Sequence, residues 1–161
     1  MKKIFVVISL LIVSMAANAQ FERGKVLINA SLSGASLSYS SQEKGHFGLE
    51  ANTGYFIVDN VALTSTIGMS LNDNVDAYHF GIGGRYYFDN CGIFVGGGLK
   101  ATDYNYKDAS DVNDFALTAE CGYAFFISKK ITVEPCAYYD FSLKDSNYSK
   151  LGVMVGFSLY F

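Results

Sequence analysis

The residues of this sequence that could do chemistry are polar side chains spaced along otherwise apolar segments. They are Glu50, Arg85, Lys100, Glu120, Glu134 and Tyr138. Carboxylates held beside basic groups are the arrangement that proton transfer and general acid–base catalysis require. The alternative is structural, because buried charges must find partners whether or not they catalyse anything. We favour the structural interpretation of this set.

His46 and His79 are the only histidines and therefore the candidates for a catalytic base. Nucleophilic hydrolysis needs a serine, a histidine and usually an acid in mutual contact. No segment of the sequence shows such a set at convincing spacing. We predict that His79 is a hydrogen-bonded residue of an interior wall, and we predict no catalytic residue.

The cysteines and the glycine-rich stretches indicate no metal or cofactor. Cys91, Cys121 and Cys136 fit no zinc-binding spacing. Cys121 and Cys136 fall on opposite faces of adjoining segments, so their thiols should point apart and form no disulfide. The stretches 81–84 and 96–98 are followed by no helix, which favours close strand packing over a phosphate loop.

The elements that carry these residues read as strands, because apolar and small or polar residues alternate with a period of two. Eight such segments follow one another at about 24–39, 46–57, 61–71, 77–88, 93–102, 113–127, 131–141 and 151–161. The last is the clearest: its odd positions, from Leu151 to Phe161, are all large and apolar. Near Gly34 and Ala35 the alternation slips, which predicts a bulge.

Connections between the segments alternate in length. They are short near 58–60, 89–92 and 128–130, and longer and polar near 40–45, 72–76, 103–112 and 142–149. Aromatic residues gather where segments end. At the short turns these are Tyr55, Phe56, Tyr86, Tyr87, Phe88, Phe125, Phe126, Tyr160 and Phe161; at the long loops they are Phe47, Tyr78, Phe80, Tyr104, Phe115, Tyr139 and Phe141. This pattern predicts an all-β fold, an eight-stranded antiparallel up-and-down transmembrane barrel with two aromatic belts.

Within such a barrel the charged residues must face the lumen, because a charge on the lipid face is strongly destabilising. Counting outward from the turns places Gly96 between Arg85 and Glu120, to within about two residues. A glycine there leaves room for the arginine to reach across. We predict an Arg85–Glu120 pair, extended into a lumen network by the other polar residues named above.

The first residues indicate export. Lys2 and Lys3 precede an apolar run and a small-residue site at 17–19, which predicts a signal peptide over 1–19 and a barrel over 20–161. The run is too short for a comfortable membrane anchor, the alternative interpretation. The formal net charge is −3, and without a basic patch we expect no nucleic-acid partner.

The signal peptide, the strand count, the strand end from Gly83 to Phe88, the Val133–Glu134–Pro135 triplet and the terminal Phe161 together resemble a family. It is the bacterial outer-membrane β-barrel family, with its OmpX-like and OmpA-type transmembrane domains. The resemblance implies an integral protein of the outer membrane and a lumen closed by Arg–Glu contacts. It also implies insertion by the barrel-assembly machinery through the terminal strand, with Phe157, Leu159 and Phe161 as the assembly signal.

The function we expect is that of a small, non-enzymatic barrel, structural in the envelope or interacting through its loops. Outer-membrane lipid would surround it, and we expect a monomer without cofactors. Three alternatives stay open: a lipid A-modifying enzyme of the acyltransferase or deacylase type, a narrow pore, and a soluble lipocalin-like barrel with its apolar face inside.

Overall fold

The computed structural model describes residues 21–39, 47–71, 75–88, 91–106 and 112–161. The predicted signal peptide, residues 1–19, lies outside them. The described elements are β1 (Val26–Tyr39), β2 (Phe47–Val58), β3 (Val61–Leu71), β4 (Val75–Tyr87), β5 (Ile93–Tyr106), β6 (Val112–Tyr123), β7 (Phe125–Ser128), β8 (Ile131–Ser142), the short 3₁₀ helix η1 (Ser146–Tyr148) and β9 (Lys150–Tyr160). Within these ranges, no helix is long and apolar enough to span a membrane.

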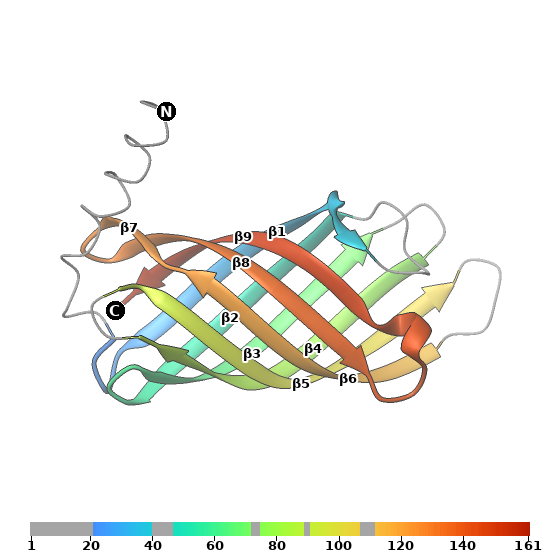
Figure 1. Ribbon diagram of the computed structural model, residues 1–161, viewed down its shortest axis with the longest axis horizontal. Coiled ribbons are helices and arrows are strands. Elements are labelled where there is room, and N and C mark those ends of the chain that lie inside the picture. The colour runs from blue at the N-terminus through green and yellow to red at the C-terminus, as the bar shows by residue number, and fades with distance from the viewer. Residues whose placement is uncertain (1–20, 40–46, 72–74, 89–90, 107–111) are drawn as a thin grey trace.

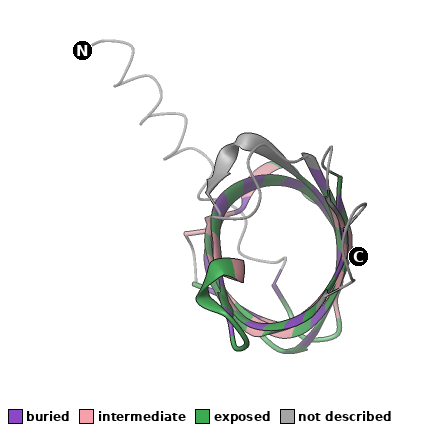
Figure 2. Cartoon of the chain, turned by 90° about the vertical axis from the view of Figure 1, so that its right-hand side faces the viewer, coloured by how far each residue is buried: buried purple, intermediate pink, exposed green. Residues whose placement is uncertain are grey.

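The strands form one antiparallel sheet that closes on itself (Figure 1). Each strand from β1 to β6 pairs with the next in sequence, β1 pairs with β9, β9 with β8, and β8 with both β7 and β6. Seen along its axis, the sheet is a ring (Figure 2). Because β6 and β7 occupy one position beside β8, the barrel has eight strands, and the predicted fold class is confirmed.

One continuous strand was predicted over 113–127. This prediction is wrong, because the segment is divided at Ala124 into β6 and β7. The register does not change across the break: Gly122 pairs with Cys136 and Phe125 with Val133, which places Tyr123 opposite Pro135. Proline has no N–H to donate to the ladder. The N–H of Ala124 instead donates to the carbonyl of Gly92 in the neighbouring turn, at 2.8 Å.

The two faces of the sheet are those that the period-two pattern predicts. Along β9 exposed and buried residues alternate without exception from Leu151 to Tyr160. Large apolar side chains point outward on all sides; Ile67, Phe115 and Phe157 are 59%, 62% and 55% exposed. Arg85 and Glu134 are buried at 5% and 2%. This molecule therefore has an apolar exterior and a polar interior.

The two ends of the barrel differ. We call the end with the β2–β3, β4–β5 and β7–β8 turns the short-turn end; β1 begins and β9 finishes there (Figure 1). The opposite end is the loop end. The predicted loops 72–76 and 103–112 are shorter in the structure, since β4 already begins at Val75 and β5 continues to Tyr106. The predicted bulge is confirmed by a register shift between Ser33 and Ser38 in the β1–β9 pairing.

Candidate functional site

The buried Arg85 joins two carboxylates inside the lumen. Its Nε lies 2.6 Å from Oε1 of Glu120, and its Nη2 lies 3.1 Å from Oε2 of the same residue. Its Nη1 lies 3.1 Å from Oε2 of Glu134. The guanidinium thus binds Glu120 through two parallel hydrogen bonds, the geometry in which arginine pairs most strongly. The contact predicted between Arg85 and Glu120 is present.

A glycine lets Arg85 cross the intervening strand. Gly96 of β5 pairs directly with Arg85 on one side and with Glu120 on the other. A Cβ at this position would collide with the Glu120 carboxylate. The same device recurs nearer the loop end, where Gly68 of β3 separates Glu50 from His79 and a Cβ would collide with the imidazole. Lumenal glycines therefore make room for contacts between strands that are not neighbours.

Glu134 is held inside the barrel by several hydrogen-bond donors. Besides Arg85, it accepts hydrogen bonds from Thr132 Oγ1 and Tyr160 OH, both at 2.7 Å, and from Asn29 Nδ2 at 3.5 Å. A buried carboxylate with several donors is satisfied and rigidly held. Glu134 was a predicted member of the network, whereas its three neutral partners were not predicted. The available signal was their lumen-facing parity on β8 (Thr132), on the neighbouring β9 (Tyr160) and on β1 beyond it (Asn29).

A second group of charges lies toward the loop end. Glu50 Oε2 is 3.0 Å from His79 Nε2, and Lys100 Nζ is 2.9 Å from Asp140 Oδ2. The Lys100 ammonium also lies 5.6 Å from the centre of the Tyr138 ring, a cation–π distance. Glu50, Lys100 and Tyr138 were predicted members of the network. His79 was predicted only as a wall residue, and Asp140, the partner of Lys100, was not among the predicted site residues.

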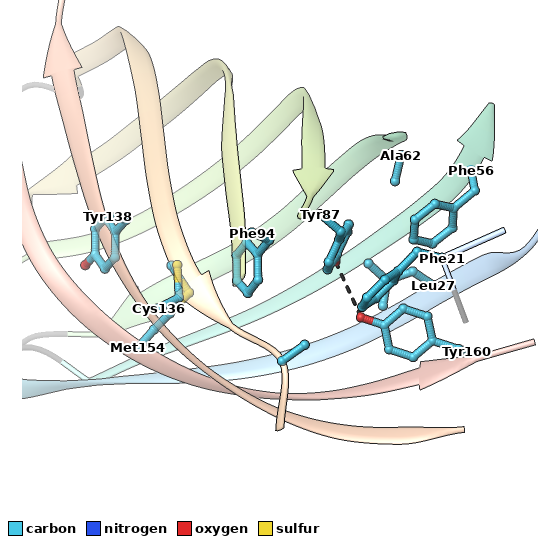
Figure 3. Packing of buried hydrophobic residues seen from close by; sticks show 11 residues of the cluster. Phe21, Leu27, Phe56, Ala62, Tyr87, Phe94, Cys136, Tyr138, Met154 and Tyr160 are labelled. Carbon is cyan, nitrogen blue, oxygen red and sulfur yellow. Dashed lines mark hydrogen bonds between the residues drawn. The ribbon is translucent and has the colours of Figure 1, made fainter. Parts of the chain in front are cut away.

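Aromatic rings fill the lumen at the short-turn end (Figure 3). We call Phe21, Phe56, Tyr87, Phe94 and Tyr160 the aromatic cluster. Phe21 enters it from the segment before β1 and stacks on Tyr87 with ring centroids 4.2 Å apart. The carbonyl of Phe21 accepts a hydrogen bond from the N–H of Asn60 at 2.7 Å, which ties the segment to the β2–β3 turn.

The predicted aromatic belts are partly wrong, because several of their residues belong to the lumen. Phe56, Tyr87 and Tyr160 are at most 1% exposed and face inward, so they do not belong to an interfacial belt. At the loop end Tyr104 is also buried, at 7%, and the side chain of Phe47 lies outside the described residues. The outward belt residues with large exposure are Tyr55, Tyr86, Phe88 and Phe161 at the short-turn end, and Tyr78, Phe80, Phe115, Tyr139 and Phe141 at the loop end.

Two small cavities lie in the part of the lumen between the Arg85 contacts and the loop end. Each has a volume of about 40 Å³, far below the roughly 300–1,000 Å³ of a typical ligand pocket. One water needs about 10–15 Å³ on this measure, so each cavity accommodates a few waters. Neither cavity is lined by a member of the aromatic cluster.

The described residues assemble no catalytic triad. His79 contacts Glu50, and no serine hydroxyl within the described ranges hydrogen-bonds to it; His46 lies outside those ranges. No three His, Cys, Asp or Glu side chains of the described chain are grouped to hold a metal ion. The predicted divergence of two thiols is confirmed, since Cys121 is exposed on the outer face and Cys136 is buried inside.

The residues predicted as an assembly signal lie on the outer face of β9 and at its end. Phe157, Leu159 and Phe161 are 55%, 40% and 57% exposed. The backbone of Phe161 exchanges two hydrogen bonds with Val26, at 3.0 and 3.1 Å, and so continues the pairing of β9 with β1. Their role as a signal stays a prediction.

Solved structures with the same architecture exist, although no family model and no curated protein matches the sequence. The N-terminal β-barrel domain of Pseudomonas aeruginosa OprF matches with a TM-score of 0.70 and 14% identity, over 86% of this chain and 98% of that one. Neisserial surface protein A matches with a TM-score of 0.66 and 15% identity, over 85% and 96%. The attachment invasion locus protein Ail of Yersinia pestis gives 0.53 and 11%, over 86% and 99%.

At these identities the likeness shows the fold alone. The chain is similar to small outer-membrane barrels of eight strands over nearly the whole of their length. The fold predicted from the resemblance is therefore confirmed. What any of these proteins binds is a separate matter.

Proposed function

We propose that this protein is a non-enzymatic integral barrel of the bacterial outer membrane, structural in the envelope or interacting through its loops, with a closed lumen. Outer-membrane lipid is its surrounding partner, the barrel-assembly machinery inserts it, and it works as a monomer without nucleic acid or cofactor. The observation that carries the proposal is the inversion of polarity: an apolar exterior around buried charges. A soluble lipocalin-like barrel has the opposite arrangement.

The interior supports a closed barrel rather than a pore. From the short-turn end, the lumen holds the aromatic cluster, then Arg85 with its two carboxylates, and then the Lys100–Asp140 and Glu50–His79 pairs. An eight-stranded barrel is just wide enough for its own side chains. Planar bilayer recordings should therefore show no large steady conductance, and such a conductance would contradict the closed lumen.

The chief alternative is a lipid A-modifying enzyme. One observation bears on it: Ser31 and Ser70 line the same loop-end cavity as Glu50 and His79. Neither hydroxyl hydrogen-bonds to the imidazole in the described structure, and the cavity is too small for an acyl chain. Mass spectra of lipid A from cells with and without the protein decide this point. Altered acylation that disappears in a His79→Ala variant would establish the enzyme.

Surface interactions would depend on the loops. Ail of Yersinia pestis has been solved with the heparin analogue sucrose octasulfate. The connections 40–46, 72–74, 107–111 and 143–149 of this chain contain no excess of basic residues, so a sulfated polyanion is a poor candidate here.

Fractionation tests the location directly. We expect the protein in the outer-membrane fraction, with the heat-modifiable gel mobility that folded barrels show in detergent. Recovery in the soluble periplasmic fraction, with no mobility shift on heating, would refute the proposal.

A further inference from the structure

Among the described residues, the lumen carries more negative than positive charge. Of the described residues, the acidic side chains inside the barrel are Glu50, Asp114, Glu120, Glu134 and Asp140, and the basic ones are Arg85, Lys100 and Lys150. The excess is two negative charges when His79 is neutral, and one when it is protonated. Uncompensated charge in a low-dielectric interior is strongly unfavourable. A further positive charge inside would therefore be stabilising.

Among the described residues, two buried side-chain oxygen atoms have no hydrogen-bond donor. They are Oδ1 of Asn52 and Oδ1 of Asp140, on residues that are 4% and 7% exposed. Both residues line the cavity closer to Arg85, which we call the mid-lumen cavity. Asn52 belongs to β2 and Asp140 to β8, so the two side chains reach this cavity from separate parts of the barrel wall.

The remaining lining of the mid-lumen cavity is also rich in oxygen. It includes the carboxylates of Glu50 and Glu120 and the hydroxyl-bearing Thr64, Thr66, Thr118 and Tyr138. Lys100 is the only basic side chain among the described residues that line it, and its ammonium is held by Oδ2 of Asp140. Hard oxygen ligands of this kind, partly neutral and partly anionic, suit an alkali or alkaline-earth cation.

We propose that the mid-lumen cavity binds a hydrated monovalent cation, Na⁺ or K⁺, through Oδ1 of Asp140 and Oδ1 of Asn52. The cavity volume of about 40 Å³ accommodates the ion with one or two waters. A divalent ion is disfavoured, because the described residues contain no cluster of three acidic, His or Cys ligands.

The ion enters from the loop end. The second cavity, on the loop-end side, shares Glu50, Lys100, Tyr138, Asp140 and Met154 with the mid-lumen cavity, so the two adjoin. Toward the short-turn end the lumen is filled by aromatic rings, and Tyr138 and Met154 lie beyond Phe94, on the side away from Phe21 (Figure 3). The site is therefore closed toward the short-turn end and reached from the loop end alone.

Unfolding of the detergent-folded barrel in NaCl and in choline chloride at equal concentration tests the site. Choline is too large for the cavity, while ionic strength is matched. At a sodium concentration ten times the dissociation constant, the ratio of folded to unfolded protein should be about elevenfold higher than in choline. Equal stability in NaCl, KCl and choline chloride would overturn the proposal and leave a water-filled cavity.

Two variants and a control locate the effect. Asp140→Asn and Asn52→Ala should each abolish most of the alkali-ion stabilisation, whereas Asp114→Asn should retain it. Asp114 is a suitable control because it is a buried lumenal carboxylate, bonded to Ser142 at 2.6 Å, that lines neither lumen cavity. Retention of the response in both site variants would overturn the assignment.

A direct measurement covers the case in which both site variants fail to fold. Crystals of the unaltered protein grown with rubidium or thallium should give an anomalous peak between Asn52 and Asp140. The absence of a peak in the mid-lumen cavity would refute the site.

Discussion

Arg85→Met tests how the buried charges around Arg85 are held together. Arg85 is 5% exposed and, among the described residues, is the only cation in contact with Glu120 and Glu134. Methionine matches the aliphatic part of the side chain but leaves two carboxylates inside without a counter-charge. Removing one partner of a buried ion pair costs about 3–5 kcal/mol. We expect a loss of free energy of unfolding in the upper part of that range, because two carboxylates are affected.

The double-mutant cycle with Glu120→Gln makes the test sharper. In the unaltered protein, Glu120→Gln removes the two-bond contact at 2.6 and 3.1 Å and should destabilise the barrel by about 3 kcal/mol, the lower end of the range, since Arg85 keeps Glu134. In the Arg85→Met background the same change removes an unpaired charge. There it should stabilise the barrel, so the effect of Glu120→Gln changes sign.

The assay must suit a chain that contains no tryptophan. Reversible urea unfolding in detergent micelles, followed by far-ultraviolet circular dichroism and by heat-modifiable gel mobility, gives the free energies. Arg23→Met serves as a control for the same chemical change at an exposed position. This substitution should lower the free energy of unfolding by less than about 0.5 kcal/mol. The reasoning is refuted if Glu120→Gln has the same sign in both backgrounds.

Four further outcomes are expected from changes at single residues. Gly96→Ala should lower the folded yield by forcing the lumenal ion pair apart, whereas Gly84→Ala, whose added Cβ finds no atom nearer than 3.6 Å, should leave yield unchanged. Phe161 deletion should reduce outer-membrane yield more than Tyr160→Phe, and equal yields would remove the terminal residue from the assembly signal. Tyr160→Phe should instead lower stability by about 1–3 kcal/mol, because a buried carboxylate loses a donor. Phe21→Ala should weaken the aromatic cluster, seen as a lower urea midpoint and faster hydrogen exchange at the short-turn end.

The barrel and its central ion pair could be predicted because two simple rules act together. Period-two alternation decides which side chains face inward, and tight turns fix the register of the strands that they join. The turn after β4 sets Arg85 opposite Gly96, and the sixth strand then brings Glu120 to the same level. For Lys100, register counting left several carboxylates as possible partners. Its choice of Asp140 depends on side-chain reach across a curved wall, which the sequence does not encode locally.

The inward aromatic rings were missed because composition was given more weight than alternation at the strand ends. Tyr87 and Tyr160 have the parity of the lumen face, and that parity decides their direction even where a run of aromatic residues suggests a membrane belt. Phe21 is different, since it precedes the first strand and no alternation applies to it. Its position follows from the hydrophobic gain of covering rings that the strands already turn inward. The same parity rule therefore makes the lumen aromatic at the short-turn end and charged toward the loop end.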